Sequence, residues 1–180
     1  MTDSSGAPFT RNQKNARVRS LAGAEALPTV VAESGRVFAT QPAAVFVFIF
    51  NDEEKVLLMR SPGSPGWRPV GGAVEAGETI LEAALRETAE EVGELVDVRP
   101  LGVAHAWTYR YDGRVRQMID VAWVMSYEGG EVVPGDDMAG SEWRWWVPGH
   151  VSDLLVSLPE GTDWLLQRAV AVFRTYSKTS

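Results

Sequence analysis

Residues 72–93 read GAVEAGETILEAALRETAEEVG, and this stretch decides the fold that we expect around it. Thr79 is followed three residues later by Glu82, which is typical of a capping box at the start of a helix. In that motif the hydroxyl and the carboxylate each accept a hydrogen bond from a free backbone amide. Gly93 suits the left-handed residue that often follows the last turn. The stretch therefore predicts a helix over residues 79–92.

One face of this helix is suited to packing against a sheet. Its members recur at the helical spacing, and a small alanine among them allows close approach. They are Leu81, Ala84, Leu85, Thr88 and Val92.

Another face of the helix is acidic. Glu87, Glu90 and Glu91 fall at i, i+3 and i+4, so their carboxylates can approach a common point. Their mutual repulsion and the macrodipole at this end of the helix both oppose such an arrangement. A divalent cation that prefers carboxylate oxygens would offset the repulsion, and the adjacent Arg86 could pair with one member. A solvated acidic face is the usual explanation of a charge run, and the helix alone favours it.

The residues before the helix change this balance, because the spacing of the whole stretch resembles the Nudix box. That pattern is G-x5-E-x7-R-E-U-x-E-E-x-G-U, where U is aliphatic. Every fixed position matches, and only Thr88 and Glu94 replace the aliphatic residues. A long, gapped pattern of mixed residue types argues against a chance match. The fixed positions are occupied by Gly72, Glu78, Arg86, Glu87, Glu90, Glu91 and Gly93.

Runs of β-prone residues separated by turn signals surround the box. They predict strands over residues 43–50, 56–60, 70–73, 96–101, 103–110, 116–127 and 142–147, and a last helix over residues 162–176. This order argues for a mixed α+β fold or an αβα sandwich. The lead-in at residues 67–72 and the Glu-x-x-Trp pattern at residues 142–145 also resemble the family. The resemblance implies the α+β Nudix fold, an αβα sandwich with a mixed central sheet.

The domain organisation follows from these boundaries. We expect residues 42–180 to form the Nudix hydrolase domain and residues 1–41 to be a tail or arm. Within the arm, residues 1–10 look disordered, residues 11–26 could be a weak helix or extended, and residues 27–39 suit a short hairpin. The arm could pair two copies of the chain as a homodimer.

Composition narrows the class of protein. A net charge of -7 argues against non-specific nucleic-acid binding, although a cation can bridge an acidic protein to a small phosphorylated ligand. Without cysteine, neither disulfides nor thiolate metal sites can form. The sequence shows no run long enough for a membrane span and no secretory signal, so we expect a cytoplasmic protein without a membrane partner.

The resemblance implies a reaction: Mg²⁺-dependent hydrolysis of a pyrophosphate bond in a nucleoside diphosphate linked to another moiety, by metal-activated water. Mn²⁺ could replace Mg²⁺. By resemblance, Glu87, Glu90 and Glu91 hold the metal together with the backbone carbonyl of Gly71 or Gly72. Glu90 or Glu91, or a carboxylate from a distant loop, would act as the base.

Other residues receive supporting roles. Glu78 is expected to brace the junction of loop and helix, and Arg86 to orient a metal-binding carboxylate. Gly71, Gly72 and Gly77 would allow backbone conformations and close approaches that a side chain would prevent. Gly93 would end the helix. Candidate substrate contacts are Arg60 and Arg68 for phosphates, Trp67 for stacking and Glu142 as a further carboxylate. Trp107 and Tyr109 could also stack on a base, although strand aromatics are more often part of the core.

The motif indicates the pyrophosphate chemistry and not the group attached to it. Nucleoside triphosphates, nucleotide sugars, ADP-ribose, dinucleoside polyphosphates and coenzyme A all fit the motif. Specificity is expected in residues 61–67, 105–117 and 134–141 and in the last helix. The alternative is a non-catalytic Nudix-fold module that senses a nucleotide, for which a complete acidic set would be unnecessary.

Overall fold

The computed structural model describes residues 29–112, 114–115, 117–135, 138–151 and 163–178. The predicted tail at residues 1–10 and the segment at residues 11–26 lie outside them. The chain divides into two compact units, Met1–Thr40 and Gln41–Ser180. Among the described residues, no helix combines the length and the apolar character needed to cross a membrane.

The first unit contains the expected hairpin. Strand β1 (Thr29–Val31) pairs antiparallel with β2 (Val37–Ala39), and Gly35 supplies the positive φ of +81° that the turn between them requires. Val31, Val37 and Phe38 are exposed on these short strands. The prediction of a hairpin within residues 27–39 is confirmed.

The second unit is built on a six-stranded mixed sheet with the order β6-β7-β3-β4-β8, and β5 also pairs with β3. Strands β3 and β7 run parallel, whereas the other pairs are antiparallel. The far end of β3 meets β4 at Phe50, and its first half meets β5. The strands are β3 (Ala43–Phe50), β4 (Val56–Arg60), β5 (Val70–Ala73), β6 (Asp97–Tyr109), β7 (Met118–Gly129) and β8 (Glu142–Trp146).

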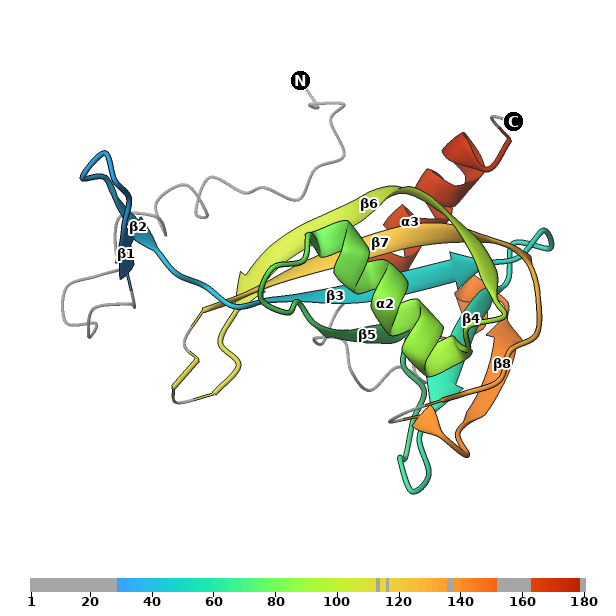
Figure 1. Ribbon diagram of the computed structural model, residues 1–180. Coiled ribbons are helices and arrows are strands. Elements are labelled where there is room, and N and C mark those ends of the chain that lie inside the picture. The colour runs from blue at the N-terminus through green and yellow to red at the C-terminus, as the bar shows by residue number, and fades with distance from the viewer. Residues whose placement is uncertain (1–28, 113, 116, 136–137, 152–162, 179–180) are drawn as a thin grey trace. The chain divides into compact units, whose positions relative to one another are not determined.

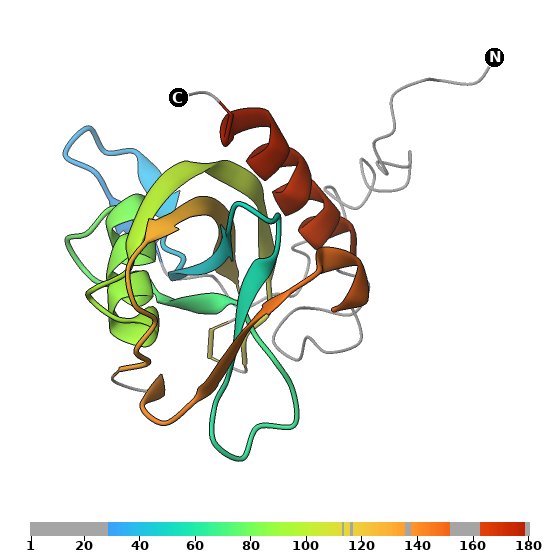
Figure 2. The same ribbon diagram turned by 90° about the vertical axis from the view of Figure 1, so that its right-hand side faces the viewer.

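Two helices cover the two faces of this sheet (Figures 1 and 2). Alternation along β3 sends Val45, Val47 and Ile49 into a core with helix α2 (Ile80–Val92). Phe48 and Phe50 point the other way, into a core with helix α3 (Asp163–Tyr176). The predicted α+β fold, an αβα sandwich with a mixed sheet, is therefore confirmed.

Some local predictions need correction. The expected strands at residues 96–101 and 103–110 are one strand, β6, with register irregularities on either side of Gly102. Leu85 is 37% exposed, and Ala83 is buried in its place, because the sheet contacts α2 along a slightly rotated stripe. Gly93 has positive φ but not the left-handed helical conformation (φ 121°, ψ 144°), since its backbone packs beside Val133.

Candidate active site

Strand β5 passes so close to its neighbours that two of its four residues must be glycine. A Cβ on Gly71 would overlap the backbone oxygen of Val45 on β3. A Cβ on Gly72 would overlap the carboxylate of Glu87 on α2. The two glycines thus let β5 fit between β3 and the acidic face of α2, with Glu87 against bare backbone.

Helix α2 begins with the predicted capping box. Thr79 accepts from the amide of Glu82 (3.2 Å), and the Glu82 carboxylate accepts from the amide of Thr79 (2.7 Å). These bonds satisfy two of the free amides at the helix start. The start of α2 is thereby fixed, and the acidic residues follow about two to three turns further along.

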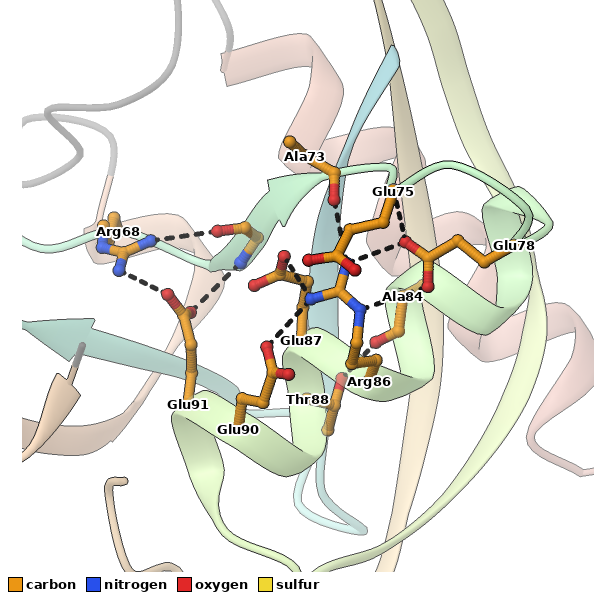
Figure 3. A network of polar contacts seen from close by, with 11 residues as sticks. Arg68, Ala73, Glu75, Glu78, Ala84, Arg86, Glu87, Thr88, Glu90 and Glu91 are labelled. Atoms are coloured by element: carbon orange, nitrogen blue, oxygen red, sulfur yellow. Dashed lines mark hydrogen bonds and ion pairs between the residues drawn. The ribbon is translucent and has the colours of Figure 1, made fainter. Parts of the chain in front are cut away.

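Arg86 joins the loop, the strand and the helix, and its five N–H groups make five hydrogen bonds (Figure 3). Nη2 donates to the carbonyl of Ala73 (2.9 Å) and, with Nε, to the carboxylate of Glu78 (2.8 and 3.1 Å). Nη1 donates to Glu87 and to Glu90, each at 2.9 Å. Arg86 thus pairs with two members of the acidic cluster, where the sequence predicted one.

Glu78 lies at the junction of loop and helix, where the sequence analysis put it. One of its oxygens also accepts from the amide of Glu75 (2.6 Å), and the hydrogen bond from Arg86 is the main cause that lowers the pKa of Glu78. Gly77, just before it, has φ of +96°, which other residues rarely adopt. The loop between β5 and α2 is therefore closed by the Arg86–Glu78 pair.

Glu91 is held by a different arginine. Its side chain is buried, its Oε1 accepts from Arg68 Nη2 (2.5 Å), and its Oε2 accepts from the amide of Gly71 (3.2 Å). Arg68 also donates to the carbonyl of Gly71 (3.3 Å; Figure 3). Arg68, a candidate for substrate phosphates, thus has a partner within the protein, and no sequence signal links it to a residue 23 positions away.

Burial raises the pKa of Glu87 and of Glu91, and in both cases it outweighs the neighbouring arginine. The arginines therefore do not fully offset the cost of burying these two charged carboxylates. Within the described residues, no three acidic or histidine side chains surround a common point, because Arg86 and Arg68 divide the cluster between them.

The donor set nonetheless fits a hard cation. Glu87, Glu90 and Glu91 offer carboxylate oxygens, and the missing side chain of Gly72 lets the Glu87 carboxylate lie against the backbone of β5, whose carbonyl groups are further oxygen ligands for such a cation.

The remaining substrate candidates lie elsewhere in the unit. Arg60 on β4 and Glu142 on β8 are cross-strand partners joined by an ion pair of 2.6 Å. Trp67 is only 5% exposed and packs edge-on against Trp146 in the α3-side core, so we assign it to packing. No hydrogen bond or ion pair among the described residues joins Arg60, Trp67 or Glu142 to Glu87, Glu90 or Glu91.

One residue was missed by the sequence analysis. Asp120 on β7 is 2% exposed, although the sequence predicts for it only a place in the strand over residues 116–127. A carboxylate between Ile119 and Val121 was the available signal, since a charge within an apolar run is seldom buried without a purpose.

Comparison with known proteins gives a family. Residues 40–165 match the model described as the NUDIX domain. Relatives include an RNA pyrophosphohydrolase of Halorhodospira halophila, 42% identical over 73 residues, which are 39% of this chain and 40% of that protein. An ADP-ribose pyrophosphatase of Methanocaldococcus jannaschii is 33% identical over 105 residues, covering 56% and 60% of the two chains. The chain thus spans about half the length of these curated relatives.

Solved structures agree on the fold. An ADP-ribose pyrophosphatase of Streptococcus suis has a TM-score of 0.59 at 19% identity, with 75% of this chain and 93% of that one covered. A structure from Listeria monocytogenes, described as that of a NUDIX hydrolase, reaches a TM-score of 0.60 at 19% identity and covers 75% of this chain and 96% of that one. At this identity the likeness shows the fold alone.

Proposed function

The chain belongs to the Nudix domain family, and on that premise we propose that it is a pyrophosphohydrolase. Its substrate would be a nucleoside diphosphate linked to another moiety, such as a nucleotide, a sugar or ADP-ribose. The observation that carries the proposal is the complete acidic set of α2, fixed by Arg86 and Arg68 beside the two glycines of β5.

The cofactor in this proposal is Mg²⁺, with Mn²⁺ as a substitute. Glu87, Glu90 and Glu91 would hold it with the carbonyl of Gly72. When bound, a divalent cation neutralises phosphate charge and lowers the pKa of a coordinated water. The raised pKa values of Glu87 and Glu91 support this assignment, because a cation would compensate the cost of burying these two charges.

The reaction is a displacement at phosphorus. The water oxygen forms a new bond to one phosphorus, the bridging P–O bond breaks, and its electron pair leaves with the departing phosphate. The proton of the water passes to a carboxylate, for which Glu90 and Glu91 are the candidates. Arg86 orients Glu87 and Glu90, and Arg68 orients Glu91, so both arginines act by positioning.

The names of two relatives and the charge of this chain support a small phosphorylated substrate. Two curated relatives are named for the pyrophosphate linkage that they hydrolyse, in RNA and in ADP-ribose. A net charge of -7 disfavours non-specific binding to nucleic acid, so a small molecule is the simpler substrate. A cytoplasmic location and a homodimer are part of the same proposal, the latter on the position of the arm alone.

A nucleotide panel with Mg²⁺ tests the function. We expect the wild-type chain to release phosphate or nucleoside monophosphate from at least one member. Glu91→Gln should lower kcat at least about 100-fold, as loss of a catalytic electrostatic or proton-transfer group does. Its fold should persist, because glutamine can still accept from the amide of Gly71.

Glu94→Gln is the matched control, since it changes an exposed glutamate just beyond the same helix. It should leave kcat within about twofold, as expected of a surface substitution remote from the reacting atoms. Equal activity of Glu91→Gln and wild type would refute the site assignment. Specific nucleotide binding without turnover of any panel member would instead identify a non-catalytic sensor.

A further inference from the structure

A pocket of about 380 Å³ lies beside the glycines of β5. We call it the Asp120 pocket; its lining includes Phe46, Gly71, Gly72, Tyr109, Met118 and Asp120. The size is within the range of small-molecule sites, and its mixture of aromatic side chains with one buried carboxylate is typical of them. Its lining residues come from β3, β5, β6 and β7 and from the segments beside them. These four strands are neighbours in the sheet (Figure 1).

Asp120 is the unusual member of this lining. The side chain is 2% exposed, and its Oδ1 has no hydrogen-bond partner among the described residues. Trp107, directly across on β6, also buries an Nε1 that has no partner in the part of the chain that the structure describes, so these neighbours do not satisfy one another. A buried acceptor without a donor is costly, which points to a partner from outside the fold.

The chemistry of that partner follows from the carboxyl group. Burial raises the pKa of Asp120 to about 6, so near pH 7 the group is mostly an ionised acceptor. Guanine presents a ring N–H beside an amino group, which are two neighbouring donors. Adenine and cytosine place acceptors next to their amino groups, and uracil flanks its N–H with two carbonyls. A carboxylate therefore pairs best with the guanine edge.

The apolar lining suits the faces of a base. Phe46 and Met118 line the pocket together with the ring of Tyr109, and Tyr111 lies edge-on to Tyr109 at 6.4 Å. Aromatic rings bind nucleobases by stacking regardless of base identity. Stacking would thus hold the base in the pocket, while Asp120 would distinguish one base from another.

The pocket and the acidic cluster share two residues of β5. Gly71 and Gly72 line the pocket, and the same two residues contact Glu91 and Glu87 from α2. Ala44 on β3 pairs with both Asp120 on β7 and Ala73 on β5, so two strand spacings, or about 10 Å, separate the carboxylate from the end of β5. A nucleoside diphosphate can span that separation.

We propose that the Asp120 pocket binds the base of the substrate and that Asp120 selects a guanine-type edge, with a ring N–H next to an amino group. The inference rests on the proposed pyrophosphohydrolase function and adds the base class to it. Asp120 is a specificity-determining residue in this account and takes no part in the cleavage.

The test measures binding without catalysis. Wild type, Asp120→Asn and the exposed control Asp97→Asn are titrated by calorimetry with GMP, IMP, AMP and UMP in the presence of a chelator. IMP differs from GMP only by the missing amino group. We expect wild type and Asp97→Asn to bind GMP at least tenfold more tightly than IMP, AMP or UMP. Asp120→Asn should lose this preference, and its affinity for IMP should equal the affinity of wild type for IMP.

Tyr109→Leu provides a second variant, which should weaken all four nucleotides without changing their ranking. An unchanged GMP preference in Asp120→Asn, no preference in wild type, or no GMP binding would each overturn the inference. The outcomes are separable from the activity assay. If wild type hydrolyses nucleotides but shows no base preference, only the assignment of the Asp120 pocket is contradicted. If wild type prefers GMP but hydrolyses no nucleotide, the hydrolase function is contradicted and the assignment of the pocket is supported.

Discussion

At the scale of single residues, two arginines set the state of the acidic cluster. The Arg86–Glu90 contact joins residues four positions apart on one helix, so the sequence could predict it. The Arg68–Glu91 contact joins a loop to the same helix across 23 positions. Only the folded sheet brings them together, which is why Arg68 was assigned to substrate from the sequence. Local spacing thus identified the cluster but not the partners that orient it.

Asp120 should make stability depend on pH in a predictable direction. Its pKa in the folded state is about 6, above the usual 3.8, so folding favours the protonated form. The stability that this preference gives is complete below about pH 4 and is lost as the pH rises through 6. A difference of roughly two pKa units corresponds to about 3 kcal/mol.

We therefore expect Asp120→Asn and wild type to have similar free energies of unfolding at pH 4. Their difference should grow to about 3 kcal/mol in favour of the variant above pH 7. Urea denaturation across this range measures it, and the other carboxyl groups titrate in both proteins and cancel. A difference that stays constant with pH would contradict the assigned pKa. A residue that costs stability at neutral pH is expected at a binding site.

At the scale of elements, the contact between β5 and α2 holds the site together. The sequence predicted the bounds of α2 well, because its start is encoded locally by Thr79 and Glu82. It misjudged Leu85 and the conformation of Gly93, which depend on where the sheet and Val133 touch the helix. The reason for Gly72 was also hidden, since the sequence does not show that Glu87 lies against it.

Gly72→Ala should disrupt this contact. The added methyl group overlaps the Glu87 carboxylate, so we expect Glu87 to turn away and the free energy of unfolding to fall by about 1–3 kcal/mol, as in other overpacked sites. Turnover should fall more than tenfold, and stabilisation by Mg²⁺ should disappear. Thermal melts without Mg²⁺ measure the loss of stability, and melts with Mg²⁺ measure whether the cation still stabilises the variant. The nucleotide panel measures turnover.

Gly149→Ala is the control, because a Cβ at Gly149 meets nothing within 4 Å. We expect it to match wild type in both melts. If Mg²⁺ raised the melting temperature of Gly72→Ala as much as that of wild type, Glu87 would not be part of the proposed metal site.

At the scale of the whole molecule, two hydrophobic cores on opposite faces of one sheet define the second unit, Gln41–Ser180. The Nudix box predicted this layering, because a helix with one apolar face after a strand must pack on a sheet. The order of the strands was not predictable in the same way. Strand β3 pairs with β4 near one end and with β5 near the other, a division that arises from tertiary packing and leaves no local signal.

The composition of these cores predicts which part of the chain folds alone. Their buried members run from Val45 to Phe173, and none comes from the β1–β2 hairpin. A chain that begins at Gln41 should therefore unfold cooperatively, with a melting temperature within a few degrees of the full chain and with the same turnover. Calorimetry and the nucleotide panel measure both. A non-cooperative melt would show that the first 40 residues complete the core.

Removal of α3 from Asp163 onward is the opposing control. Leu165, Leu166 and Phe173 belong to the α3-side core, so this chain should lose cooperative unfolding, because a face of the sheet loses its cover.

Sedimentation of the full chain and the Gln41 chain at equal concentration tests the oligomeric state. If the arm pairs two copies, only the full chain should sediment as a dimer, whereas equal masses would exclude the arm as the interface.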